Sequence, residues 1–327
     1  MKNSISRSKA QSGLTLIEIM IAITISLVLL AGVVQIFFSA KQSYNIQQAL
    51  SRVQENARMV NDTMLRDIAS AGYMGCLGTP EEVINTLSDK SSSYDFASSI
   101  AGSDGGAGNS DSITVRHVSE ASAIPVMLPM TSQSAPIELV DNRFGLKQWD
   151  VVTVSDCSHV AVFMITNEPA TTGTVEIQHV TGQVAPDDGT TQNAGQSNST
   201  DDLQHIFGSP EASNAKIYSV GTTTYEIKAS TNNPKKKSLF ITPGGEIEGI
   251  EDMQIQYGLG NSPTGTPVIA EQYLDADDPK IDWKNVVAVR ITFVVNSVDL
   301  MVKLGEGDGL LHKTFTTTIR LRNRAPA

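Results

Sequence analysis

The sequence predicts an α+β protein in which one long N-terminal helix packs on a β-rich globular head. A run near the N-terminus, Ile19 to Val34, contains no charged residue. Beyond it, apolar residues recur every three or four positions as far as Ala71, which is the spacing of one helix face. After residue 85, β-branched segments alternate with Gly, Ser, Asn and Asp, the residues that favour turns.

Length and composition narrow the class of protein. The 327 residues are 40% hydrophobic and 18% charged, which is enough for a globular domain with a sizeable core. The net charge is −11, and an acidic body argues against nucleic-acid binding because phosphate contacts need a basic surface. The sequence has no HExxH, GxSxG or phosphate-binding glycine motif, so we expect neither an enzyme nor a bound cofactor.

The N-terminal 38 residues have the pattern of a membrane anchor. Residues 1–13 are short, polar and basic, with Lys2, Arg7 and Lys9 and no acidic residue. Residues 14–38 are mostly apolar, and about 20 apolar residues at a rise of ~1.5 Å each span a bilayer core as a helix. Because the basic flank stays in the cytoplasm, the sequence predicts export of the rest of the chain.

A cleaved secretory signal is the alternative interpretation of this segment. Such a signal carries small residues after its apolar run, whereas Gly13 precedes the run here and Ser39-Ala40-Lys41 after it is a poor cleavage site. Glu18 also lies inside the run. A carboxylate at membrane depth is costly, so Glu18 is a functional candidate that needs a partner, the alternative being a carboxylate that reaches the membrane surface.

The segment Ser12-Gly13-Leu14-Thr15-Leu16-Ile17-Glu18 resembles the class III signal of type IV prepilins and type II secretion pseudopilins. The resemblance implies that residues 1–13 are a leader, that a prepilin peptidase cuts after Gly13, and that the new amine of Leu14 is methylated. It also implies that Glu18 of an incoming subunit meets the amine of a subunit already in the fibre. Opposite charges in a low-dielectric setting would neutralise each other there.

Residues 39–75 are expected to form the amphipathic half of the same helix. The apolar stripe on that helix consists of Ile46, Leu50, Val53, Ala57, Val60, Met64, Ile68 and Ala71. Gly72 and Gly75 are placed to end the helix. A coiled-coil seam is the alternative, but a membrane-spanning half followed by an amphipathic half fits a stem that packs on a head.

Further segments resemble the PilW type of minor pilin and narrow the family. The first is Ala71-Gly72-Tyr73-Met74-Gly75-Cys76 at the end of the stem. Others are Gly249 to Gly258, Asp282 to Arg290, and the closing Ile319 to Arg324. The resemblance covers residues 12–76 and about 245–324, leaves residues 77–244 unmatched, and extends in part to J-type pseudopilins.

Residues 76–327 are expected to form one β-rich head with loop insertions. The predicted strands are Ser112 to Val118, Val151 to Ser155, Val160 to Ile165, Thr174 to Val180, Lys216 to Ser219, Thr223 to Lys228, Ser238 to Thr242, Met253 to Tyr257, Val286 to Val295 and Lys313 to Arg322. The predicted loops are Gly102 to Ser110, Thr181 to Asp202, Gly258 to Pro267 and Asp275 to Pro279.

The chain has two cysteines, Cys76 and Cys157. An exported head matures in an oxidising compartment, so we expect these two residues to form a disulfide, the alternative being two buried free thiols.

Neither the histidines nor the acidic clusters predict a metal site. The five histidines are scattered, and no two have the spacing of a metal-binding motif. Asp275, Asp277 and Asp278 lack the spacing of a calcium loop and are expected to form a solvated turn.

The resemblance implies a minor pilin that acts in the tip or priming complex of a type IV pilus and supports twitching motility, adhesion or DNA uptake. Its expected partners are the prepilin peptidase, other minor pilins, the major pilin, the inner-membrane platform of the pilus and a pilus-tip adhesin. The head would lie in the periplasm before assembly and in the fibre, near its tip, afterwards. The alternatives are a J-type pseudopilin of a type II secretion system and a membrane-anchored adhesin or ligand-binding module that never polymerises.

Overall fold

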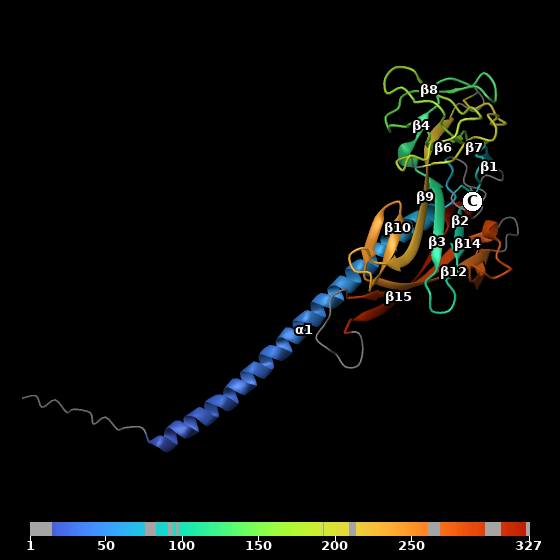
Figure 1. Cartoon of the computed structure of the whole chain (residues 1–327). Coiled ribbons are helices and arrows are strands. Elements are labelled where there is room, and N and C mark those ends of the chain that lie inside the picture. Colours follow the sequence, from blue (N-terminus) through green and yellow to red (C-terminus); the bar gives the residue numbers. More distant parts are fainter. Residues whose placement is uncertain are drawn as a thin grey trace, which may run out of the picture. The chain divides into compact units, whose positions relative to one another are not determined.

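The computed structural model describes residues 15–75, 83–90, 94–95, 98–191, 193–208, 214–260, 269–297 and 309–324. The predicted α+β class is confirmed, because one long helix is followed by a β-rich head with several sheets (Figure 1). Helix α1 extends over Leu16–Ser70. The strands are β1 Val83–Asn85, β2 Ile100–Ser103, β3 Ser112–Val118, β4 Ile124–Pro125, β5 Ile137–Leu139, β6 Val151–Ser155, β7 Val160–Met164, β8 Val175–Ile177, β9 Lys216–Ala229, β10 Lys237–Thr242, β11 Gly245–Glu248, β12 Ile250–Gly260, β13 Ala270–Leu274, β14 Val286–Asn296 and β15 His312–Arg320, with short 3-10 helices η1 Glu120–Ser122, η3 Trp283–Asn285 and η4 Arg322–Arg324.

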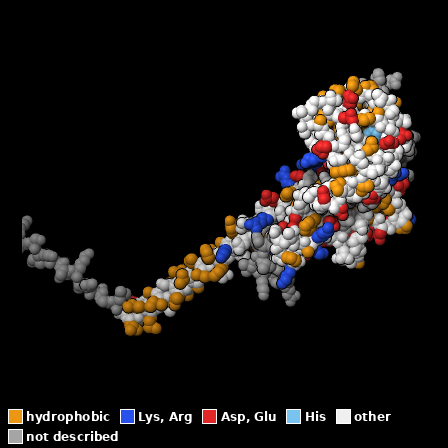
Figure 2. All heavy atoms as spheres, turned by 45° about the horizontal axis from the view of Figure 1, so that its top comes forward, with side chains coloured by type: hydrophobic (Ala, Val, Ile, Leu, Met, Phe, Trp, Pro, Cys, Tyr) orange, Lys and Arg blue, Asp and Glu red, His pale blue; other side chains and the backbone are white. Residues whose placement is uncertain are grey.

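The chain divides into two compact units. The first comprises Met1–Arg52 with Asp299–Leu311, and the second comprises Val53–Val298 with His312–Ala327. In the first unit, apolar side chains from Leu16 to Phe38 are exposed on all sides of α1, and Figure 2 shows them along the helix. This part of the helix is long and apolar enough to cross a membrane.

The second unit contains three sheets within the described residues. The largest has nine strands, six of which lie in the order β1-β7-β6-β9-β10-β11. Strands β3 and β4 also pair with β9, and β2 pairs with β3. The second sheet has the order β13-β12-β14-β15, and β5 pairs with β8 in the third. Strand β9 is 14 residues long and pairs with β3, β4, β6 and β10, so it links most of the largest sheet.

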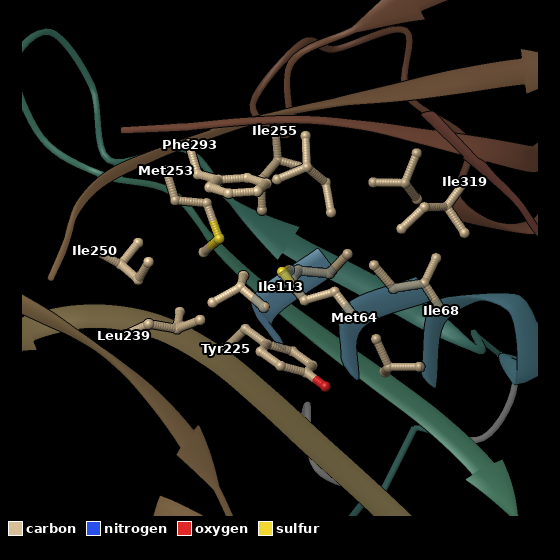
Figure 3. Packing of buried hydrophobic residues seen from close by; sticks show 14 of the residues in the cluster. Met64, Ile68, Ile113, Tyr225, Leu239, Ile250, Met253, Ile255, Phe293 and Ile319 are labelled. Carbon is tan, nitrogen blue, oxygen red and sulfur yellow. The ribbon is translucent and has the colours of Figure 1, made fainter. Parts of the chain in front are cut away.

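The main core of the second unit lies between residues 53–70 of α1 and two of these sheets (Figure 3). The predicted stripe is confirmed from Val53 to Ile68 of α1 and at Ala71 directly after the helix, all of which lie in this core. The prediction is wrong at Leu50, which is 38% exposed. The sheets contribute, among others, Tyr225 of β9, Ile255 of β12 and Phe293 of β14. A second cluster, formed mainly by residues of β4 to β8, includes Val154, Phe163 and Ile177.

Every strand that the sequence predicted is present. Two predicted strands, Lys216 to Ser219 and Thr223 to Lys228, are parts of the single strand β9. The short strands β1, β2, β4, β5, β11 and β13 were not predicted. Two predicted loops are wrong at their start, because Gly102 and Ser103 belong to β2 and Gly258 to Gly260 belong to β12. Residues 261–267 lie outside the described residues.

Two methionines on α1 give a matched test of the helix packing. Met64 is 1% exposed in the main core, whereas Met59 is 56% exposed. We expect Met64→Ala to lower the free energy of unfolding by about 2–5 kcal/mol, because it removes buried volume from a packed core. Met59→Ala should change it by no more than about 0.5 kcal/mol. Equilibrium unfolding of the full chain in detergent measures both values, and equal losses would contradict the packing described.

Candidate functional site

The N-terminal end of α1 is closed by a reciprocal pair of side chains, Thr15 and Glu18. The backbone N–H of Thr15 donates to Glu18 Oε2 at 2.9 Å, and the Thr15 hydroxyl donates to the same oxygen at 2.8 Å. The backbone N–H of Glu18 lies 3.4 Å from Thr15 Oγ1. This is a capping box, in which a Thr and a Glu three residues later satisfy backbone donors of the first helical turn.

The capping box fixes Glu18 at the start of the membrane-length segment. Both hydrogen bonds from Thr15 use Oε2, and a carboxylate can accept several donors, so Glu18 can bind a further amine. Gly13 and Leu14, the residues predicted at the cleavage site, lie outside the described residues. Processing at Gly13 and Leu14, and docking through Glu18, therefore stay predictions.

In the second unit, polar contacts join residues 53–70 of α1 to the head. The Tyr225 hydroxyl of β9 donates to Asp67 Oδ2 at 2.6 Å. Burial raises the pKa of Tyr225, and the hydrogen bond to Asp67 raises it further, so the phenol stays protonated as the donor. The Asn56 side-chain amide donates to the Glu248 carbonyl at 3.1 Å.

The end of α1 is held by backbone and side-chain bonds from distant segments. The N–H of Gly72 donates to the Arg116 carbonyl at 3.0 Å, and the N–H of Val118 donates to the Tyr73 carbonyl at 2.9 Å. The Asn323 amide, near the end of the described chain, lies 3.3 Å from the Ser70 carbonyl. The contact from Asn323 satisfies a carbonyl that the helix end leaves without an intrahelical partner, and the other two bonds tie the segment after α1 to β3.

Gly75 brings the segment after α1 against the largest sheet. Its φ of +93° favours glycine, and a Cβ there would lie 2.9 Å from the Tyr218 ring and 3.1 Å from Ser155 Cβ. Ser155 ends β6, two positions before Cys157, while Gly75 directly precedes Cys76. In the sequence, each of the two cysteines therefore lies within two positions of the close approach between Gly75 and Ser155.

The disulfide itself stays a prediction. No free cysteine is found among the described residues, but Cys76 lies outside them.

The structure also brings together a group that sequence spacing did not indicate. Asp156, His159 and His205 place one oxygen and two ring nitrogens within 4.8 Å of one another. Asp156 and His205 are 49 positions apart, so no local motif could reveal them.

Two family models match the chain. Residues 8–34 match the prokaryotic N-terminal methylation motif, which spans Gly13, Leu14 and Glu18. Residues 217–323 match the model described as type IV pilus-assembly protein W, which runs from β9 to η4. Comparisons with curated proteins and with solved structures gave no match.

A methylation motif on a membrane-length helix, followed by a β-rich head, defines a type IV pilin-like protein. Together with that motif, the match to residues 217–323 supports a minor pilin of the PilW type. The two matches indicate a structural pilus component, and this context suggests association with a membrane and with other pilus components.

The PilW-type match begins 28 positions before residue 245, where the sequence resemblance was expected to resume. The added segment, from Ile217, contains most of β9 together with β10. The family region thus supplies the strands that carry most of the main core, whereas β1 to β8 lie outside the match.

If Cys76 and Cys157 form a disulfide, intact-mass measurement after alkylation should show it. Alkylation of the full chain without reductant should leave both cysteines unlabelled, and alkylation after reduction should label both. Replacing Cys76 and Cys157 together by Ser should lower stability by about 2–5 kcal/mol, because the bridge restricts the unfolded chain. Two labelled thiols without reductant would refute the bridge.

Proposed function

We propose that this minor pilin joins other minor pilins in a complex at the pilus tip that primes assembly of the major pilin. The observation that carries the proposal is the capped acidic turn, Thr15 to Glu18, at the start of a membrane-length helix within the methylation motif. The complex would serve twitching motility, adhesion or DNA uptake.

Processing would remove residues 1–13 and leave Leu14 as a methylated N-terminus. Thr15 and Glu18 both belong to the mature chain, so cleavage leaves the capping box in place. The turn then presents a carboxylate one helical turn from the amine of its own chain. Glu18 is the group proposed to meet the amine of a neighbouring subunit, where the two charges neutralise each other away from water.

The proposed organisation of the mature chain has three parts. Residues 14–38 would span the inner membrane before assembly, residues 39–75 would form the stem, and residues 76–327 would form the head in the periplasm. The packing of α1 from Val53 to Ile68 against the head supports a stem that stays attached to it. The bridge between Cys76 and Cys157 would add a covalent link to β6 and β7.

The head is proposed to contact other minor pilins, the major pilin and a tip adhesin, while the prepilin peptidase and the inner-membrane platform act on the N-terminal segment. A J-type pseudopilin in a secretion pseudopilus, and an anchored adhesin that never polymerises, are the competing assignments.

The N-terminus of the protein in sheared surface pili tests the proposal directly. We expect mass spectrometry of that fraction to find a chain that begins at a methylated Leu14. A processed chain confined to the cell envelope would favour the pseudopilin, and an uncut chain that begins at Met1 would contradict assembly through this motif.

A substitution of Glu18 separates docking from processing. Glu18→Gln keeps the size of the side chain and removes its charge, so cleavage should continue while recovery in sheared pili falls about tenfold or more, as expected when one buried charge loses its partner. Glu55→Gln, an exposed carboxylate on the same helix, is the matched control and should leave recovery unchanged. Normal recovery of the Glu18 variant would rule out the docking role.

A further inference from the structure

The turn between β6 and β7 holds a carboxylate in a fixed orientation. Asp156 begins this turn, and its Oδ1 accepts hydrogen bonds from the Ser158 N–H at 3.0 Å, the Ser158 hydroxyl at 2.7 Å and the His159 N–H at 2.9 Å. Cys157 has a φ of 70°, which lets the chain reverse within the turn. The Asp156 side chain is fully buried, and its second oxygen, Oδ2, contacts His205.

His205 reaches the same carboxylate from a distant loop. Its Nε2 lies 2.6 Å from Asp156 Oδ2. Leu203 and Phe207 on either side of it are fully buried in the second core cluster, and Gln204 between them has a φ of 56°. The loop is thus anchored around His205, and Phe207 also meets the His205 ring edge-on, with centroids 4.9 Å apart.

His159 completes the group from the turn itself. Its ring stacks on His205 with centroids 3.9 Å apart and an interplanar angle of 14°. The Ser158 hydroxyl lies 3.0 Å from His159 Nδ1. His159 is exposed, so the group is buried on the carboxylate side and open to solvent on the other.

We propose that Asp156, His159 and His205 form a binding site for one divalent transition-metal ion of the zinc class. Two imidazole nitrogens and one carboxylate oxygen are a ligand set suited to zinc, with water in the fourth position. Magnesium and calcium are poor candidates, since they prefer six or more oxygen ligands.

The observed distances show what binding requires. The three ligand atoms lie within 4.8 Å of one another, whereas tetrahedral zinc with bonds of about 2.0–2.2 Å needs ligand atoms about 3.4 Å apart. The ion would replace the hydrogen bond between Asp156 Oδ2 and His205. The exposed His159 ring must turn out of its stack so that its nitrogen points at the ion, while Asp156 and His205 are already held by the turn and by the buried neighbours of His205.

Metal at this position would join two segments that are far apart in the sequence. The β6–β7 turn and the loop that carries His205 both belong to the part of the chain outside the PilW-type match. The ion would therefore stabilise that part of the head, whether or not the protein assembles into a fibre.

The test uses the full-length chain in detergent, without a histidine tag and freed of metal by a chelator. Isothermal titration with Zn²⁺ should give one site per chain, and Zn²⁺ should raise the thermal unfolding temperature. Co²⁺ should show the visible absorption of a tetrahedral ion. His159→Gln and His205→Gln should each weaken Zn²⁺ binding at least about tenfold, because each removes a ligand.

The control is His312→Gln, a histidine of β15 in a different sheet, which should bind Zn²⁺ as the natural chain does. Asp156→Asn is a poorer probe, since Asp156 also holds the turn. Three results would overturn the site: Zn²⁺ binding without one-to-one stoichiometry, equal affinity in the His159 and His205 variants and the natural chain, or an unfolding temperature that Zn²⁺ leaves unchanged. Loss of affinity in only one of the two variants would also overturn the three-ligand site.

Discussion

The architecture of the head depends on the burial of one helix stripe. From Val53 to Ile68 the apolar face of α1 lies against two sheets, and every one of its stripe residues there is at most 4% exposed. Burial of apolar surface contributes roughly 25 cal/mol per Å², so a stripe of this length outweighs any single polar contact in the head. The Asp67–Tyr225 hydrogen bond and the bonds at the end of α1 then fix the register of the helix on the sheets. If this helix face were not packed on the sheets, the main core would be open to solvent on one side.

The two parts of helix α1 have surfaces that suit two different environments. From Leu16 to Phe38 its side chains are mostly apolar on every side, which suits lipid, and beyond Val53 only one face is apolar, which suits a protein core. The change needs no break in the backbone, because α1 is continuous over 55 residues. At its start, the capping box supplies acceptors that neither lipid nor core could offer to the first turn.

Much of this was predictable because the signals are local. The uncharged run, the three- and four-residue spacing and the alternation in β14 and β15 each depend on neighbouring residues, and each gave the right element. Strands such as β4 and β5, with two or three residues, are too short to show a period. The T-x-x-E spacing of Thr15 and Glu18 is also local, although the sequence analysis predicted a docking role for Glu18 and not the capping box. The contact of His205 with Asp156 was not predictable, because it depends on how two loops meet in space.

Strand β9 has a consequence for how the head responds to load. At its beginning it pairs with β6 beside the second core cluster, and further on it pairs with β3 and β10 over the main core. A single strand that is hydrogen-bonded into both clusters couples their unfolding, since neither can open fully without breaking part of the same ladder. Force applied to the head would therefore be shared across both cores as one cooperative element.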